Sequence, residues 1–457
     1  MIKRVLIANR GEIAVQTIRA LHEMDLQAVA VYSTADRDSL FVQIADQAVC
    51  IGSGLPQDSY LNMGAILDAA VLTGSDAIFP GYGFLAENSE FAELCQDYGV
   101  KFIGPSAEVI NLMGNKANAK ETMKKLDVPT IPGSDGFVDS LADAKRIAAE
   151  IGYPVMLKAA AGGGGKGIRQ VNNQTELVQA YTDTKRESQL SYGDDRLYLE
   201  KDLSDAKHIE MQAIADQHGH VVYFPERDCS LQRNHQKILE ESPCPELSEA
   251  ERAHMGEVVV RAMRGIHYEN TGTFEFLMDP EHHFYFMEMN TRLQVEHTIT
   301  EEVADVELIK AMIMVANGDD LPFRQADCGV HGYALECRIN AEDPTQNFQP
   351  CAGKITKLHF PVGTKGVRID SGVEVGSLIS PFYDSMIAKI IVHMPTKPAA
   401  VAKMIRVLRE FEIEGVKTNR EFLLAVLQDQ HFQTGDFNNL YIENVFLKDW
   451  MKQNGPK

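Results

Sequence analysis

The chain has 457 residues, of which 44% are hydrophobic and 24% charged, an ordinary composition for a globular protein of about three domains. Its 65 acidic residues outnumber the 44 basic ones, and a formal net charge of −21 argues against general affinity for nucleic acid or anionic membranes. The seven cysteines lack metal-binding spacing, the start of the chain has no signal-peptide layout, and no apolar run approaches the roughly 20 residues of a membrane span, so we expect a cytoplasmic protein.

Strands and helices alternate in the first part of the chain. Apolar runs and helical spacing predict strand 5–8, helix 14–21, strand 28–32, helix 63–70, strand 76–79 and strand 100–104. This order predicts a parallel sheet with helices on both faces, a Rossmann-like domain over residues 1–114. The turn at residues 9–12 reads NRGE and not G-x-G-x-x-G, so the shape does not imply dinucleotide binding.

Four consecutive glycines at residues 162–165 stand between two predicted strands. The first strand, 154–158, ends in Lys158, and the second covers 168–171. Backbone N–H groups of a glycine-rich hairpin can approach phosphates closely, and Lys158 can be aimed at the same phosphates. The run is not a P-loop, because no G-x-x-x-x-G-K-[ST] leads into a helix, and a plain flexible linker is the alternative.

The strands that follow carry several polar side chains. Strands are predicted at residues 197–203, 208–215 and 221–224. Alternation along the second strand places His208, Glu210 and Gln212 on one face. Residues 227–237, RDCSLQRNHQK, then concentrate charged and amide groups, for which a solvated surface cluster is the alternative.

Two strand-like runs at residues 273–277 and 284–287 predict a β-hairpin. Side chains alternate along a strand, so Glu288 and Asn290 share a face, and one register places Glu275 diagonal to Glu288. Two carboxylates and an amide oxygen that converge in this way suit Mg²⁺ or Mn²⁺ held together with phosphate oxygens. A hairpin whose charged residues merely face water is the alternative.

The residues just beyond this hairpin favour the chemical interpretation. Arg292 and Glu296 lie four positions apart, directly after the candidate ligands. A guanidinium binds anions, and a carboxylate can act as a base. Next to a metal and phosphate site, this pair indicates reaction chemistry and not a solvated surface.

The remainder of the chain, residues 329–457, predicts a mixed α+β domain. Strands are predicted at 333–340, 353–358, 366–369 and 386–392, and helices at 399–411 and, as the last element, from about 419. Glycine and proline turns separate the short strands. No internal repeat or low-complexity segment is present in the sequence.

Six stretches, in their order along the chain, carry a resemblance to a known family. They are residues 8–14 (ANRGEIA), 80–85 (PGYGFL), the glycine run, 227–237, 288–297 (EMNTRLQVEH) and 338–344 (RINAEDP). Together they make the chain resemble biotin carboxylase, the ATP-grasp subunit of biotin-dependent carboxylases. The resemblance implies an α/β protein with an ATP-grasp domain over 115–328, which includes a mobile lid over about 131–203, flanked by the two domains predicted above.

The family's activity is ATP-dependent carboxylation of biotin by bicarbonate, and the resemblance assigns a set of residues to the nucleotide. Those residues are Lys116 and Lys158 at the phosphates, Gly164 and Gly165 in the covering flap, Glu200, Lys201 and Leu203 at the adenine hinge, and His208, Gln232 and His235 in the rest of the pocket. The resemblance also implies one or two Mg²⁺ or Mn²⁺ ions on Glu275, Glu288 and Asn290.

The same resemblance assigns the second substrate and biotin. Bicarbonate falls to Lys237, Arg292, Gln294 and the backbone of Val295, with Glu296 as the base that takes its proton, whereas Arg338 and Tyr82 fall to biotin. Attack on the γ-phosphate would give carboxyphosphate, which releases CO₂ beside biotin, and the metal and cations would neutralise the reacting anions. Closure of the flap would exclude the water that otherwise hydrolyses this anhydride.

The chain departs from the family's pattern at four places. Thr298 stands where proline is common, Asn234 where a basic residue is common, Ala304-Asp305 where Thr-Gly is usual, and Cys351-Ala352 where Ser-Pro is common. None of these changes removes a named catalytic group. Thr298 and Asp305 lie close to the predicted metal strand, so they bear on its rigidity and on the rate.

No biotin-attachment motif of the Met-Lys-Met type is present. We therefore expect biotin on a separate biotin carboxyl carrier protein and separate carboxyltransferase subunits, which favours acetyl-CoA carboxylase and the first step of fatty acid synthesis. Members of the family are often homodimers.

Three alternatives stand beside this interpretation. One is a biotin carboxylase subunit that serves propionyl-CoA or pyruvate, and another is a ligase of the carbamoyl-phosphate synthetase type. The motif at 338–344 and the chain length argue against the latter. The third is a nucleotide-binding regulator with a dead site, against which the complete set of catalytic residues argues.

Overall fold

The computed structural model describes residues 1–159, 168–192, 194–234 and 236–455. The chain forms two compact units, one made of Met1–Val128, Lys207–Phe276 and Glu288–Lys457 and the other of Pro129–Ala206 and Leu277–Met287. Each unit has a hydrophobic core of its own. Within the described residues, no helix combines the length and the apolar character needed to cross a bilayer.

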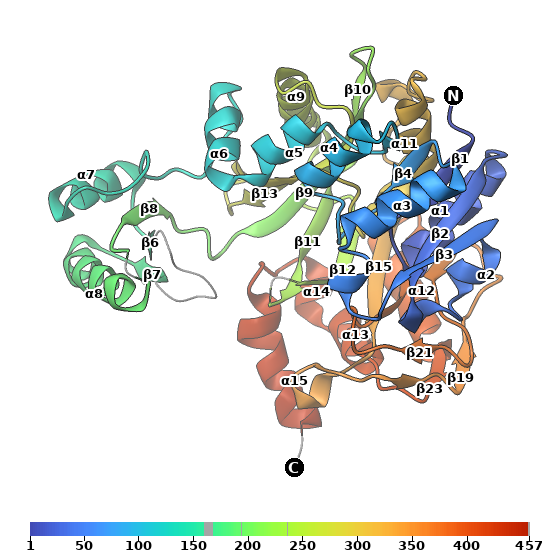
Figure 1. The fold of residues 1–457 in the computed structure, drawn as a ribbon. Coiled ribbons are helices and arrows are strands. Elements are labelled where there is room, and N and C mark those ends of the chain that lie inside the picture. The colour runs from blue at the N-terminus through green and yellow to red at the C-terminus, as the bar shows by residue number, and fades with distance from the viewer. Residues whose placement is uncertain (160–167, 193, 235, 456–457) are drawn as a thin grey trace. The chain divides into compact units, whose positions relative to one another are not determined.

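The first unit opens with the predicted parallel sheet (Figure 1). Its strand order is β3-β2-β1-β4-β5, with β1 (Arg4–Ile7), β2 (Gln27–Ser33), β3 (Gln47–Gly52), β4 (Ala77–Phe79) and β5 (Lys101–Phe102). Val5 packs in one core with α1 (Gly11–Glu23), whereas Leu6 packs in another with α3 (Met63–Thr73) and α4 (Ser89–Asp97). Helices therefore cover both faces. Strand β3 was not predicted. Its residues 48–51 (AVCI) form a short apolar run without alternation, and most of its side chains at this sheet edge are exposed or half-buried.

The largest sheet joins segments that lie far apart in the sequence. Its order is β14-β13-β9-β11-β12-β15-β22-β20, with β10 beside β9. The strands are β9 (Lys207–Ala215), β10 (Val221–Tyr223), β11 (Arg227–Arg233), β12 (Gln236–Ser242), β13 (Asn270–Met278), β14 (Phe284–Asn290), β15 (Tyr333–Asn340), β20 (Val367–Ser371) and β22 (Met386–Met394). Most of the polar stretch 227–237 lies in two paired strands, and its residues 227–232 are buried, so the alternative of a solvated cluster is wrong there.

Helices and short strand pairs complete the first unit. The helices are α2 (Leu40–Ile44), α5 (Ala107–Gly114), α6 (Lys116–Lys125), α9 (Glu249–Gly265), α10 (His297–Ala304), α11 (Leu308–Asn317), α12 (Lys397–Glu410), α13 (Arg420–Gln428), α14 (Gln430–Thr434) and α15 (Leu447–Asn454). The short strands are β16 (Glu342–Asp343), β17 (Gln349–Pro350), β18 (Gly353–Lys354), β19 (Lys357–His359), β21 (Leu378–Ile379) and β23 (Glu412–Glu414). The prediction that the helix from about 419 is the last was wrong, because α15 follows and buries Trp450 against Phe422.

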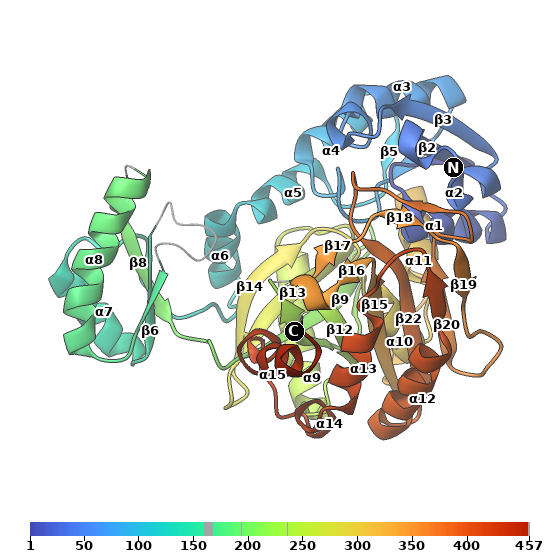
Figure 2. The same cartoon turned by 90° about the horizontal axis from the view of Figure 1, so that it is seen from below.

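The second unit is a small antiparallel sheet covered by two helices (Figure 2). The sheet order is β7-β6-β8, with β6 (Val155–Ala159), β7 (Ile168–Val171) and β8 (Leu197–Lys201), and α7 (Leu141–Ile151) and α8 (Gln174–Tyr192) pack into the same core. Lys158 pairs with Ile168, which is the strand pairing predicted for the hairpin. The glycines at 162–165 between these strands lie outside the described residues.

Candidate functional site

Lys237 on β12 is at the centre of a cluster of buried charges in the first unit. Its ammonium donates to Glu210 on β9, to Glu275 on β13 at 3.1 Å and to Glu296 before α10 at 2.6 Å. Arg227 on β11 donates to the other oxygen of Glu210 at 2.5 Å. The four strands β13, β9, β11 and β12 are neighbours in the sheet, so sheet pairing brings these side chains together.

Opposite charges control protonation in this cluster. Burial opposes the charge on Lys237, but Glu210, Glu275 and Glu296 outweigh it and raise the pKa of the lysine well above its ordinary value. Burial also opposes the charges of Glu275 and Glu296, yet the neighbouring cations lower the pKa of both carboxyls. For Glu210 burial dominates and raises the pKa. The cluster therefore holds two ionised carboxylates beside one that retains its proton more readily.

Arg338 on β15 extends the cluster through Glu296. Its guanidinium donates to Oε1 of Glu240 at 2.6 Å and to Oε2 of Glu296 at 2.8 Å. Burial raises the pKa of Glu240 to about 8, although Arg338 acts in the opposite direction. Because Lys237 binds one oxygen of Glu296 and Arg338 binds the other, the carboxylate is fixed from both sides.

The turn after β14 places Arg292 beside the cluster. Its Nε donates to Glu87 at 2.7 Å, its Nη1 to Oε1 of Gln294 at 3.0 Å, and its Nη2 to Oδ1 of Asn290 at 3.1 Å. The amide nitrogens of Asn290 and Gln294 each donate to Oε1 of Glu275 at 2.9 Å. Hydrogen bonds therefore connect Arg292 through two amides to Glu275.

His208 and Gln232 line the other side of Glu275. Nε2 of His208 lies 3.2 Å from Oε2 of Glu275, and its Nδ1 lies 2.8 Å from Nε2 of Gln232. Both side chains are buried. His235, the third residue predicted for this part of the pocket, lies outside the described residues.

Lys116 at the start of α6 forms an ion pair with Glu288 on β14 at 2.9 Å. The Glu288 side chain is 34% exposed, against 6% for Glu275. Asn290 contacts Glu275 directly, and the ammonium groups of Lys237 and Lys116 each contact one of the two carboxylates. These oxygens attract cations in this structure, and hard carboxylate and amide donors suit Mg²⁺ or Mn²⁺, so the residues fit such an ion.

The second unit carries the remaining residues predicted for the nucleotide. Lys158 on β6 forms an ion pair of 2.5 Å with Glu200 on β8. Lys201 at the end of β8 donates to Asp279 at 3.1 Å and to the hydroxyl of Tyr285 at 3.2 Å. Leu203 follows this strand and is half-buried. Gly164 and Gly165 lie outside the described residues.

The two motifs near the start of the chain contact each other. The amide nitrogen of Asn9 donates to the carbonyls of residues 80 and 82 at 2.7 and 2.8 Å. Gly81 has a φ of +64°, and a Cβ there would lie 3.0 Å from that same amide nitrogen, so the loop requires glycine. The ring of Tyr82 and the carbonyl of Val295 both lie near the ammonium of Lys389.

Sequence reasoning missed four residues of this site: Glu87, Glu210, Glu240 and Lys389. The alternation along β9 did place Glu210 on the same face as His208. Its role as a partner of Lys237 follows only from the pairing of β9 with β11 and of β11 with β12. No signal in the sequence pointed to the other three as members of the site.

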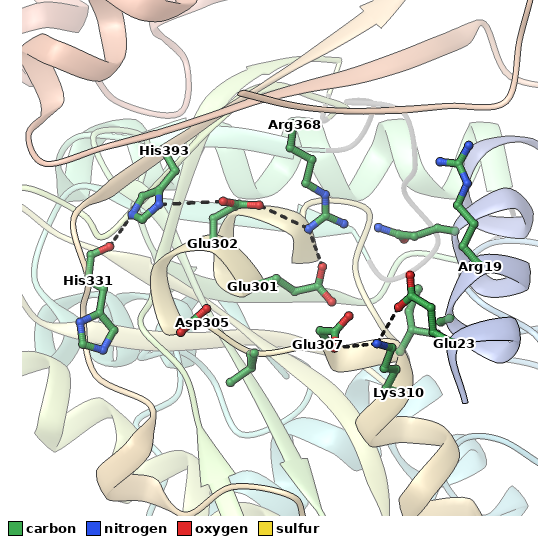
Figure 3. A pocket seen from close by; sticks show the side chains of 14 residues that line it. Arg19, Glu23, Glu301, Glu302, Asp305, Glu307, Lys310, His331, Arg368 and His393 are labelled. Carbon is green, nitrogen blue, oxygen red and sulfur yellow. Dashed lines mark hydrogen bonds and ion pairs between the residues drawn. The ribbon is translucent and has the colours of Figure 1, made fainter. Parts of the chain in front are cut away.

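A separate cavity of about 630 Å³ lies in the first unit (Figure 3). None of the sequence-predicted site residues is among the described residues that line it. Its charges largely pair with one another, as in Arg368 with Glu301 at 2.8 Å and Lys310 with Glu23 at 2.7 Å. Asp305, which also lines it, has a φ of +54° at the end of α10, where the family's usual glycine is free of strain.

Three family models match successive parts of the chain. They are the biotin carboxylase N-terminal domain over residues 1–110, the ATP binding domain of the carbamoyl-phosphate synthase L chain over 115–324, and the biotin carboxylase C-terminal domain over 336–444. With the fold described above, these matches define an ATP-grasp ligase. The chain belongs to the biotin carboxylase family and is an ATP-dependent enzyme of that family.

Relatives and solved structures agree with this assignment over almost the whole chain. Biotin carboxylase 1 of Bacillus subtilis is 50% identical over 444 residues, which are 97% of this chain and 98% of that protein. The 2-oxoglutarate carboxylase small subunit of Hydrogenobacter thermophilus is 47% identical, with 97% and 93% covered. The biotin carboxylase domain of a thermophilic 2-oxoglutarate carboxylase bound to bicarbonate is 45% identical at a TM-score of 0.93, with 97% and 98% covered. The predicted family and α/β fold class are thus confirmed.

Proposed function

We propose that this chain carboxylates biotin held on a separate carrier protein, using bicarbonate and ATP. The observation that carries the proposal is the arrangement around Glu296, whose two oxygens are bound by Lys237 and Arg338. Arg292 and Gln294 lie within the same hydrogen-bonded network. A base, two candidate anion-binding groups and a candidate biotin-binding guanidinium thus meet in one buried place.

In the proposed first step, an oxygen of bicarbonate attacks the γ-phosphorus of ATP and the bond to ADP breaks. Arg292, Lys237, Gln294 and the backbone of Val295 bind bicarbonate, and Glu296 takes its proton. While Lys237 and Arg338 contact Glu296, they keep its pKa low. Bicarbonate that attracts Lys237 to itself weakens this effect, and Glu296 becomes a stronger base when the substrate is present.

In the second step, carboxyphosphate releases CO₂ and phosphate. The released phosphate takes the proton of the ureido nitrogen of biotin, and that nitrogen attacks the CO₂. Negative charge on the ureido oxygen then needs a partner, which we propose is Arg338. Tyr82 packs against the biotin. Exclusion of water during these steps protects the anhydride from hydrolysis.

For the nucleotide, we propose the residues that the family resemblance names. Lys116 and Lys158 bind the phosphates, and Glu275, Glu288 and Asn290 hold one or two Mg²⁺ or Mn²⁺ ions. Such an ion would neutralise phosphate charge during transfer. The hinge residues, the glycine flap, the lid over about 131–203 and the division at 114 and 328 stay predictions from the sequence.

The partners and the final acceptor are also part of the proposal. We propose a biotin carboxyl carrier protein, carboxyltransferase subunits and acetyl-CoA as the acceptor, with a cytoplasmic homodimer as the working form. The names of the relatives give different acceptors, since they include a pyruvate carboxylase subunit and a 2-oxoglutarate carboxylase subunit at 47% identity each. A solved relative described as a dimer supports the homodimer.

The test is phosphate release from ATP by the purified chain, with bicarbonate and free biotin varied independently. The expected result is a rate that requires bicarbonate and rises with biotin, together with ¹⁴C transfer from bicarbonate to biotin. Phosphate release that depends on ammonia, or that does not change with biotin concentration, would instead favour a ligase of the carbamoyl-phosphate synthetase type. Adding purified carriers and acyl acceptors to the same assay identifies the final acceptor.

Arg292→Ala is expected to lower the rate more than the affinity for ATP. Removal of one preorganised cationic donor at a reacting anion typically costs about 100-fold or more in rate. We expect Arg292→Lys to recover little of the lost rate. The planar guanidinium of arginine binds Glu87, Gln294 and Asn290 simultaneously, and a single ammonium cannot replace these three contacts. Initial rates over a grid of ATP and bicarbonate concentrations measure this, and near-normal turnover in the alanine variant contradicts the assignment.

Glu288→Gln is expected to raise the concentration of Mg²⁺ or Mn²⁺ needed for half-maximal activity and to lower the activity at saturating metal. The ion pair with Lys116 is exposed and contributes at most about 1 kcal/mol, so the variant stays folded. Glu121→Gln is the matched control, because it removes a lysine partner of the same kind on the surface of α6. Equal metal requirements in the two variants would remove Glu288 from the metal site.

A further inference from the structure

Lys389 on β22 is a lysine whose side chain is completely buried. Its ammonium donates to the carbonyl of Val295 at 2.9 Å and lies 3.2 Å from Oε1 of Glu12. It also lies 5.7 Å from the centre of the Tyr82 ring, within the range of a cation–π interaction. One charged group therefore contacts three segments of the chain that are far apart in sequence.

Two of these three contacts reach residues that the proposed reaction uses. The carbonyl of Val295 belongs to the peptide bond that joins Val295 to Glu296, so Lys389 fixes the backbone directly before the candidate base. Lys389 is also the cross-strand partner of Arg338 in the pairing of β15 with β22. The side of the sheet that carries the biotin guanidinium thus also carries this ammonium.

The orientation of the Tyr82 ring depends on its contact with Lys389. Its hydroxyl oxygen is buried and has no hydrogen-bond partner among the described residues. The backbone of its loop is held by Asn9, which binds the carbonyl of Tyr82 and not the ring. Apart from apolar packing, the ring is therefore oriented by the ammonium on its face.

Burial opposes the charge on Lys389, but Glu12, Glu336 and Asp370 outweigh it and raise the pKa of the lysine above its ordinary value. Glu12 makes the single ion pair with Lys389, and its carboxylate oxygens have no hydrogen-bond donor among the described residues. Burial raises the pKa of Glu12 to about 7, against the effect of Lys389. A pair of apolar residues would satisfy the core at least as well, so stability alone does not explain the pair.

We propose that Lys389 is a positioning residue for the biotin half of the reaction, which orients Tyr82 and the peptide before Glu296 toward each other. This inference rests on the proposed function. Lys389 itself touches neither substrate. Its loss should therefore affect the use of biotin more than the use of ATP.

The test is the double variant Lys389→Met with Glu12→Gln, which removes the ammonium together with the charge of the carboxylate that forms its ion pair. We expect a thermal unfolding midpoint near that of the unchanged chain. We expect the KM for free biotin to rise, or kcat for its carboxylation to fall, by about tenfold or more, because a charged hydrogen bond and a cation–π contact are both lost. The KM for ATP should change less than about twofold.

Lys397→Met with Glu241→Gln is the matched control, since Lys397 at the start of α12 is also a largely buried lysine that pairs with a buried carboxylate, Glu241, and faces an aromatic ring, Phe432. It touches none of the proposed site residues. This control should also keep an unfolding midpoint near that of the unchanged chain, and it should change neither KM value. A purely structural role for Lys389 predicts the same behaviour in both lysine variants.

The outcomes separate the inference from the function beneath it. If the unchanged chain transfers no ¹⁴C to biotin, the proposed function fails. If it does and the folded double variant has an unchanged KM and kcat for biotin, the inference is wrong. Should the double variant not fold, Lys389→Gln with Glu12→Gln is measured instead. Glutamine carries no charge, so the cation–π contact with Tyr82 is lost even if a hydrogen bond to the carbonyl of Val295 forms, and an unchanged KM and kcat for biotin in this variant also overturns the inference.

Discussion

We expect Glu296→Gln to lower the rate of biotin carboxylation by about 100- to 10,000-fold, because a positioned base usually contributes a factor of this size. Glutamine keeps the shape of the side chain but cannot take the proton of bicarbonate. It also removes the negative charge that Lys237 and Arg338 share, so each cation loses one carboxylate partner and attracts a substrate anion more strongly. We therefore expect ATP and bicarbonate to bind at near-normal or lower concentrations while turnover is lost. Single-turnover measurements of phosphate release separate the two effects.

Glu336→Gln is the matched control for this prediction. Glu336 is as completely buried as Glu296 and lies on β15, where the hydroxyl of Thr298 donates to it. The two carboxyls differ in protonation: burial raises the pKa of Glu336, whereas the cations around Glu296 overcome burial and lower its pKa. Glutamine resembles a protonated glutamate, so the control should lose less than about tenfold in rate. Equal losses of rate in the two variants would mean that Glu296 acts through the structure of the buried cluster and not as a base.

Local patterns predicted much of the fold because they depend on neighbouring residues. Apolar alternation located β9, β13 and β14, and helical spacing located α1 and α12. The edge strand β3 was missed, because a short apolar run without alternation does not by itself distinguish a strand from a helix segment. The helices after α13 were also missed, since α15 buries little apart from Trp450.

The residues of the candidate site also differ in whether local sequence patterns could predict them. Residues 288–297 run from the end of β14 into the turn that follows it, so a common site for them could be predicted from their spacing in the sequence. Glu87 could not be found in this way, because its contact with Arg292 joins positions 205 apart in sequence. Glu240 and Lys389 also looked like ordinary strand residues, and only the pairing of β12, β15 and β22 shows that they face the cluster.

The departure at Thr298 gains a physical meaning from these contacts. Its hydroxyl binds Glu336, whose other oxygen is buried without a hydrogen-bond partner among the described residues. Proline at this position would have no hydroxyl to donate. This buried hydrogen bond therefore joins the first turn of α10 to β15.

We expect Lys237→Met to abolish activity and to lower the free energy of unfolding strongly. The variant leaves Glu210, Glu275 and Glu296 close together without the cation that joins them, and breaking a buried ion pair typically costs about 3–5 kcal/mol. Mutual repulsion should raise the pKa of these carboxyls in the folded state above their unfolded values. A raised carboxyl pKa means that the folded state binds more protons, so stability falls as the pH rises through that range. The unfolding midpoint of the variant should therefore be closer to normal at pH 6 than at pH 8.

A second substitution distinguishes charge from shape in this prediction. Glu210→Gln in the Lys237→Met background removes one carboxylate, and we expect it to recover part of the stability at pH 8 while activity stays absent. Glu210 is the right choice because burial already raises its pKa and it is not proposed to bind a substrate. Thermal unfolding of both variants at the two pH values measures the effect. A deficit that does not depend on pH, or that the second substitution does not reduce, would show that Lys237 acts through packing and that the buried charges are balanced in another way.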